Sequence, residues 1–283
     1  MSCRLPTHAI PRDYKVDYTK LDLAAPFVFE GDMTITLDLP AGGSENFITL
    51  HCLDLCVSSA SFRRPGCSSS SIMTASSLSV NVKNQTLTAV FDEALGAGEP
   101  CVGCELQLRF SGRLNDQMRG LYRSKYSTSS GEDRFLACTQ FEATDARRAF
   151  PCWDEPALKA TFQLSVTVRV DAGAALIAVS NTTVAEICEF AAGPPGSVGR
   201  YKKFSFERTP LMSTYLAALV VGEFDVVSRR SPTTGIQTSV YTMPSKAKQG
   251  LFCLDTAIKA LDFFIETYDF PYPLSKSDLL ASK

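Results

Sequence analysis

The sequence predicts a mainly β fold, built as an antiparallel sandwich or a large open sheet. The first observation is a period-2 alternation of apolar and polar residues, clearest in the segments 32–39, 106–110 and 162–170. Such alternation places one face of a strand against a core and the other face in water. The second observation is that turn-forming segments rich in Gly and Pro separate these strands, at 40–43, 96–98, 193–196 and 233–235. Strands that follow one another without intervening helices favour antiparallel pairing.

The composition is that of an ordinary globular protein. Of the 283 residues, 45% are hydrophobic and 20% are charged, and the formal net charge is −2. This charge gives no basic surface for nucleic acid and no polybasic patch for a membrane. The longest apolar run, Tyr215–Val221, is too short to span a bilayer, and the N-terminus has no apolar signal segment. We therefore expect a cytoplasmic protein with reduced cysteines and with neither nucleic acid nor a membrane as a partner.

A helical pattern replaces the alternation after Pro244. Apolar residues recur at steps of three and four from Ala247 to Tyr268, which predicts a helix with one apolar face. Ser245 is the expected N-cap, and the prolines that follow Asp269 should end the helix there. The apolar face needs a partner, so either the helix packs on the sheet or a second domain begins here.

The usual catalytic motifs are missing from the sequence. It contains no H-E-x-x-H motif, and its two histidines are His8 and His51. We expect His51 to be a strand-end residue, because it closes the apolar segment Phe47–His51, and His8 to be solvated. The pair Cys101 and Cys104 is a lone C-x-x-C, for which a strand-edge turn is the simpler interpretation. We therefore predict no metal site within this chain.

The segment 139–156, TQFEATDARRAFPCWDEP, combines six charges with three aromatic rings. Two interpretations fit this composition. Glu142 and Asp145 could form ion pairs with Arg147 and Arg148 and so hold a long crossover loop. Alternatively, a carboxylate is held in a cleft to bind a cation, and a protonated amine is the obvious candidate because a carboxylate only accepts hydrogen bonds.

The longer segment TQFEATDARRAFPCWDEPALKATF resembles the signature of the M1 family of zinc aminopeptidases, and is closest to their puromycin-sensitive and aminopeptidase N-like members. Similar landmarks stand on both sides of it, at Gly120–Ser124 (GLYRS), Phe206–Tyr215 (FERTPLMSTY) and Tyr272–Leu274 (YPL). The resemblance thus covers nearly the whole chain.

The resemblance implies a fold, a division into domains and a site. Residues 1–222 would form the family's saddle-like N-terminal β-sandwich, and residues 223–283 the first strands and one helix of a thermolysin-like α/β catalytic domain. Glu142 matches the glutamate that binds the free α-amino group of a peptide substrate, and Gln140 matches the glutamine that lines the adjacent S1 pocket. A carboxylate that requires a free amine at a fixed place would explain exopeptidase selectivity.

The sequence departs from the family at its C-terminal end. The G-A-M-E-N and H-E-x-x-H segments are absent, and Ser275 and Ser277 replace the usual proline and apolar residue. We expect a chain truncated before the zinc site and inactive alone, with zinc belonging to the full-length metalloprotease. Its expected partners are peptide N-termini, and the missing catalytic domain or a full-length homologue. The alternative is a naturally short, non-catalytic paralogue that acts as a peptide-binding or interaction module.

Overall fold

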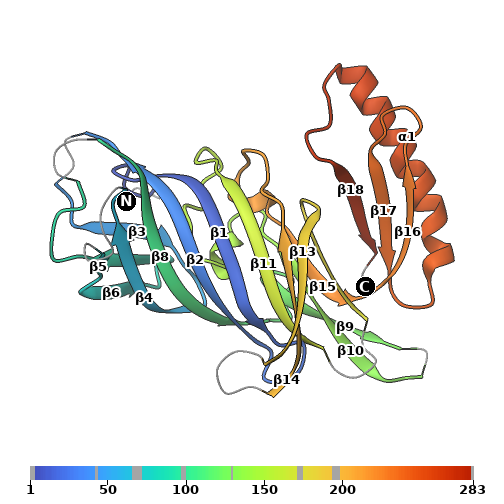
Figure 1. Cartoon of the computed structure of the whole chain (residues 1–283), viewed down its shortest axis with the longest axis horizontal. Coiled ribbons are helices and arrows are strands. Elements are labelled where there is room, and N and C mark those ends of the chain that lie inside the picture. The colour runs from blue at the N-terminus through green and yellow to red at the C-terminus, as the bar shows by residue number, and fades with distance from the viewer. Residues whose placement is uncertain are drawn as a thin grey trace.

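The computed structural model describes residues 4–41, 44–65, 72–96, 100–128, 130–170, 175–192 and 198–281. These residues form four β-sheets and one α-helix. The largest sheet has eight strands in the order β13-β14-β11-β1-β2-β8-β4-β5, and it bends along its strands (Figure 1). Its strands are β1 (Ile10–Leu21), β2 (Val28–Leu39), β4 (Leu55–Arg63), β5 (Met73–Thr74), β8 (Cys101–Arg113), β11 (Thr161–Val170), β13 (Val184–Ala192) and β14 (Val198–Phe206).

Two of the three smaller sheets share the core of the large one, and the third, β16-β17-β18, packs on the four-stranded sheet. A four-stranded sheet has the order β12-β15-β10-β9, and two three-stranded sheets have the orders β3-β7-β6 and β16-β17-β18. Their strands are β3 (Phe47–His51), β6 (Ser77–Asn81), β7 (Thr86–Val90), β9 (Gly120–Ser127), β10 (Asp133–Gln140), β12 (Leu176–Ser180), β15 (Leu219–Glu223), β16 (Asp225–Arg230), β17 (Gln237–Thr242) and β18 (Lys276–Ala281).

Alternation of side chains explains why these segments are strands. In β2 and β8 the buried residues occupy every second position, so one face of the large sheet carries the core and the other carries Thr, Ser, Gln and charged side chains. Most strand pairs are antiparallel, which confirms the predicted fold class; β1 with β11 and β17 with β18 are parallel. The predicted turn 233–235 joins β16 to β17, whereas those at 40–43, 96–98 and 193–196 include positions outside the described residues.

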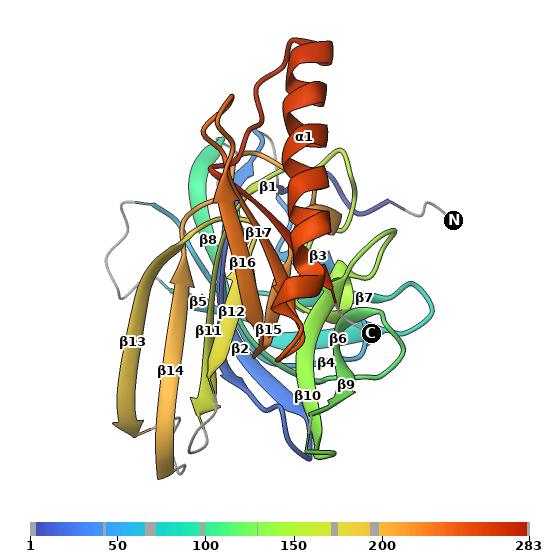
Figure 2. The same ribbon diagram turned by 90° about the vertical axis from the view of Figure 1, so that its right-hand side faces the viewer.

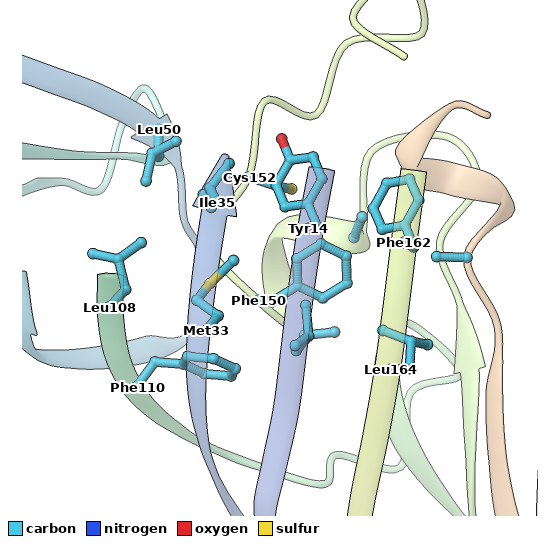
Figure 3. Packing of buried hydrophobic residues seen from close by; sticks show 14 of the residues in the cluster. Tyr14, Met33, Ile35, Leu50, Leu108, Phe110, Phe150, Cys152, Phe162 and Leu164 are labelled. Atoms are coloured by element: carbon cyan, nitrogen blue, oxygen red, sulfur yellow. The ribbon is translucent and has the colours of Figure 1, made fainter. Parts of the chain in front are cut away.

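Aromatic rings fill the core between β1, β11 and the segment 141–153. Phe150 lies beside Tyr14 and Phe162 (Figure 3), with ring centroids 6.1 Å and 6.3 Å away. Tyr14 and Phe162 stack with their centroids 4.9 Å apart, because they face each other across the parallel β1–β11 pair. Trp153 is also fully buried, and its backbone N–H donates to the Tyr14 hydroxyl at 3.1 Å. These contacts anchor the segment that contains the candidate site residues.

The C-terminal helix begins later than predicted. Helix α1 spans Gly250–Tyr268, and a short 3-10 turn, Ala247–Gln249, precedes it. Ser245 is therefore not the N-cap; it lies outside the helix with a φ of +69°. The helix ends where predicted, with Asp269 in the left-handed conformation. It lies along the sheet β16-β17-β18 (Figure 2), where Leu254 and Ile258 pack on Val240.

Only part of the predicted apolar stripe of α1 is covered. Leu254 and Ile258 of this stripe are buried, whereas Leu251 and Tyr268 are exposed. Three further rings of the helix, outside the predicted stripe, are exposed as well: Phe252, at 82%, Phe263 and Phe264. The stripe therefore has a buried part on the sheet and a second, open part. Within the described part of the chain, no helix combines the length and the apolar character needed to cross a membrane.

Candidate functional site

The candidate site residues lie where β10 ends and the chain turns back into the core. Gln140 is the last residue of β10. Phe141 points into the core, where its ring meets that of Phe150 edge to face at 5.9 Å. Glu142 follows it and is exposed, and its peptide bond to Ala143 is cis. A short 3-10 helix, Ala146–Arg148, then returns the chain to the interior, so Glu142 stands on a short loop that is anchored on both sides.

Glu142 makes no hydrogen bond or ion pair to another described residue. The predicted pairing of Glu142 with Arg147 or Arg148 is therefore wrong. Arg148 instead contacts Asp145, at 2.7 Å, and Asp54. Arg147 turns inward to Asp154. The arginines of this segment are thus occupied elsewhere, and the carboxylate of Glu142 is left unneutralised at the surface.

Gln140 lines a pocket of about 390 Å³ between the four-stranded sheet and the β16-β17-β18 unit. Its lining mixes apolar side chains with polar and charged ones in similar proportion. Its lining includes Tyr122, Tyr241, Tyr272, Lys276 and Asp278. Glu142 does not line this pocket. The two predicted site residues are thus two positions apart in the chain, but only Gln140 lies at the pocket.

A buried ion pair holds the segment behind this loop. Arg147 Nε lies 3.0 Å from Asp154 Oδ2, and the two side chains are only 9% and 1% exposed. Their remaining groups are also paired: Thr214 donates to Asp154 Oδ1 at 3.0 Å, and Arg147 Nη1 donates to Gln85 at 3.0 Å. A buried charge pair is tolerated when further hydrogen bonds satisfy it, as here. Of the ion pairs predicted for the segment, the one between Asp145 and Arg148 is confirmed, whereas the partner of Arg147 is Asp154, which was not predicted.

His51 is part of the same buried network. It is the last residue of β3, as expected, and its Nδ1 accepts a 3.1 Å hydrogen bond from the backbone N–H of Asp154. Because Nδ1 is the acceptor, protonation of this atom would break the bond. Burial, together with the nearby positive charge of Arg147, lowers the pKa of His51 to about 4. His51 is thus a neutral structural group at neutral pH.

We expect this depressed pKa to make stability depend on pH. The pKa of His51 in the unfolded chain is about 6.5, so below that pH the unfolded state takes up a proton that the folded state refuses. The contribution of His51 to the free energy of unfolding, roughly 1–3 kcal/mol, is therefore fully present above about pH 6.5 and is lost as pH falls toward 4. Urea unfolding of wild type and His51→Gln between pH 7 and 4 measures it. A parallel loss of stability in both proteins would contradict the assignment.

The other histidine, His8, lies elsewhere; it is half-buried and so only partly solvated. His8 Nε2 lies 2.8 Å from the carbonyl oxygen of Phe47, and the ring packs edge to face on the Phe47 ring at 4.9 Å. Among the residues that the structure describes, no three His, Cys, Asp or Glu side chains are grouped so that they could hold a metal ion.

Several residues that support the site were not identified from the sequence. His51, Gln85 and Thr214 bond to the Arg147–Asp154 pair from distant parts of the chain, and Gly120 is covered by the loop itself. Gly120 carried a local signal, because it begins the GLYRS landmark and a glycine at a strand end can mark a close approach of the backbone. Thr214 lies in the FERTPLMSTY landmark, but nothing in that segment indicated its bond to Asp154.

Comparisons with known proteins agree with the geometry. The Peptidase M1 N-terminal domain family matches residues 10–216. Aminopeptidase M1-C of Oryza sativa subsp. japonica is 43% identical over 278 residues, which cover 98% of this chain and 28% of that protein. Aminopeptidase M1 of Arabidopsis thaliana is 41% identical, and the puromycin-sensitive aminopeptidase of Caenorhabditis elegans 37%; the matches again cover 98% of this chain, and 29% and 27% of those proteins. The chain thus spans less than a third of these relatives. It belongs to the M1 peptidase family, and it contains that family's N-terminal domain.

Proposed function

We propose that this chain supplies the amine-binding part of a zinc-dependent M1 aminopeptidase, which removes residues from peptide N-termini. The observation that supports this most directly is the state of Glu142. Its carboxylate is exposed and unpaired among the described residues, although three charged residues, Asp145, Arg147 and Arg148, lie within six positions of it. A carboxylate kept apart from neighbouring arginines is available for a cation from outside.

A peptide's α-ammonium group fits this carboxylate. A charge-assisted hydrogen bond from an ammonium to a carboxylate is stronger than a neutral one, and an N-acetylated peptide cannot form it. Gln140, at the end of β10, lines the pocket two positions before Glu142. In this proposal the pocket receives the first side chain of the bound peptide. The proposal assigns amine binding to Glu142 and side-chain contact to Gln140.

The proposal also assigns different roles to two domains of the chain. Residues 1–222 form the substrate-amine-binding β domain, and residues 223–283 begin a catalytic domain. The H-E-x-x-H motif does not occur in the 283 residues, so zinc binding and hydrolysis are assigned to another part of the enzyme, and this chain alone is proposed to be inactive. A cytoplasmic location stays a prediction from the sequence.

Replacing Glu142 by Gln is expected to weaken peptide binding by about 1.5–3 kcal/mol, because one charged contact to the ammonium is lost. This corresponds to a roughly 10- to 100-fold weaker Kd. The measurement is an NMR titration of the chain with a short peptide that has a free N-terminus and with its N-acetylated form. Wild type should prefer the free amine, and Glu142→Gln should lose the preference.

Glu93→Gln is the matched control, because it removes the same charge from another exposed glutamate. It should leave the preference intact. If wild type binds both peptides equally, Glu142 is not an amine anchor. In a protein that joins this chain to a zinc-binding catalytic domain, Glu142→Gln should raise KM and leave the bound zinc unchanged.

A non-catalytic interaction module is the second candidate, and the open aromatic surface of α1 favours it. The size of the native protein separates the two. An immunoblot band well above the 30.8 kDa of this chain supports the aminopeptidase, and a single band at that mass supports the module.

A further inference from the structure

We infer that Gly120 and Arg148 are positioning residues for Glu142: the Arg148 side chain occupies the space that a side chain at position 120 would need, and so holds the loop 141–148 against the end of the β9–β10 hairpin. The inference rests on the proposed role of Glu142. It adds two residues that contact neither the expected amine nor the pocket at Gln140.

Gly120 is tightly enclosed by the loop. It pairs across the sheet with Gln140, two residues before Glu142. A Cβ atom added at Gly120 would lie 2.5 Å from Arg148 Cβ and 3.3 Å from the carbonyl oxygen of Asp145. Neither atom is the mobile end of a side chain, so the loop itself would have to move. The φ of Gly120, +66°, independently favours glycine.

Arg148 also holds the loop through its charged end. Its Nε lies 2.7 Å from Asp145 Oδ1, and its Nη1 contacts the carboxylate of Asp54, the residue just before β4. Asp145 also donates its backbone N–H to Phe141 at 2.8 Å, which closes the turn around Glu142. The turn that carries Glu142 is thus closed by the hydrogen bond between Asp145 and Phe141. Arg148 connects it to β9 of the four-stranded sheet, through the contact at Gly120, and to Asp54 beside β4 of the large sheet.

This arrangement matters for binding because an anchor must stand at a defined place. A misplacement of about 1 Å can lower a rate about 100-fold in an enzyme site. Glu142 itself is exposed and makes no hydrogen bond or ion pair to another described residue, so its position depends on the loop. Gly120 and Arg148 supply a close approach between this loop and the hairpin.

Gly120→Ala tests the inference, with Gly131→Ala as the matched control. Gly131 lies in the turn at the other end of the same hairpin with a φ of +82°, but a Cβ there would meet nothing within 4 Å. Both changes therefore strain the backbone, and only the first displaces the loop. Hydrogen exchange of the full chain should show the amides of Asp145 and Arg148 at least tenfold less protected in Gly120→Ala than in Gly131→Ala, with β1 and β11 unchanged.

Equal protection in the two variants, or a loss spread evenly over the whole fold, would overturn the inference. Arg148→Met keeps the stem over Gly120 and removes both ion pairs, so it should increase exchange in the same loop by a smaller factor. Wild-type exchange in Arg148→Met would overturn the role of the ion pairs.

The peptide titration then separates this inference from the proposed function. Gly120→Ala should reduce the preference for a free amine at least tenfold, and Gly131→Ala should not. If wild type shows no preference, the amine-binding role fails, and the exchange result alone still decides whether Gly120 and Arg148 hold the loop. A preference that survives in Gly120→Ala overturns the positioning role and leaves the role of Glu142 standing.

Discussion

Replacing Asp154 by alanine is expected to lower the free energy of unfolding by about 3–5 kcal/mol, because it leaves the buried Arg147 without its partner. The guanidinium cannot lose its charge and cannot reach water, since its side chain is only 9% exposed. Thr214 loses its hydrogen-bond acceptor in the same step. The effect should therefore exceed that of a lost surface ion pair by a wide margin.

Urea unfolding at pH 7 measures this effect, and Asp32→Ala provides the comparison. Asp32 pairs with Arg109 at 2.8 Å, but both side chains are about half exposed or more, so solvent replaces the lost contact and stability should barely change. If Asp154→Ala proved as mild as Asp32→Ala, the Arg147–Asp154 pair would not be the support of the crossover segment that the geometry indicates.

Replacing Phe150 by alanine is the second large effect, and it should also lower the free energy of unfolding by about 3–5 kcal/mol. The ring is 1% exposed and meets the rings of Tyr14, Phe141 and Phe162. Its removal leaves a cavity among strands that cannot collapse into it, because β1 and β11 are tied by their own backbone hydrogen bonds. The substitution thus loses both buried apolar area and packing.

Phe252→Ala is the control for Phe150→Ala, because it makes the same change of side chain at an exposed position. Phe252 is 82% exposed on α1, so the same change of side chain should leave stability almost unaltered. Urea unfolding of both variants, with the slope of the transition checked against wild type, gives the difference. Equal losses would mean that Phe150 is not at the centre of the core.

The strands could be predicted from the sequence because their signal is local. The alternation in 32–39 and 162–170 depends only on neighbouring residues, and both segments lie within strands, β2 and β11. The start of α1 was predicted wrongly because serine is a common N-cap residue, but Ser245 has a φ of +69°, which no sequence pattern indicated. The 3-10 turn that precedes the helix carries no separate signal.

The site was less predictable because its contacts are long-range. The ion pairs expected in the segment 139–156 were assigned by proximity in sequence, which suggested Glu142 as a partner. The structure brings Asp54, Gln85 and Thr214 to this segment from 60 or more residues away, and those partners leave Glu142 unpaired. The carboxylate indicated by the resemblance is thus available, whereas of the ion pairs expected from spacing only that between Asp145 and Arg148 forms.

The parallel pairing of β1 with β11 has a consequence for biosynthesis. Asp13 and Thr161, which pair across these strands, are 148 positions apart. At about 5–20 residues per second, the ribosome takes roughly 7–30 seconds to make the partner strand after β1 has appeared. During that interval the β1 edge of the growing sheet is open, and unpaired edges invite association with other chains. We expect the nascent chain to depend on chaperones until β11 is complete.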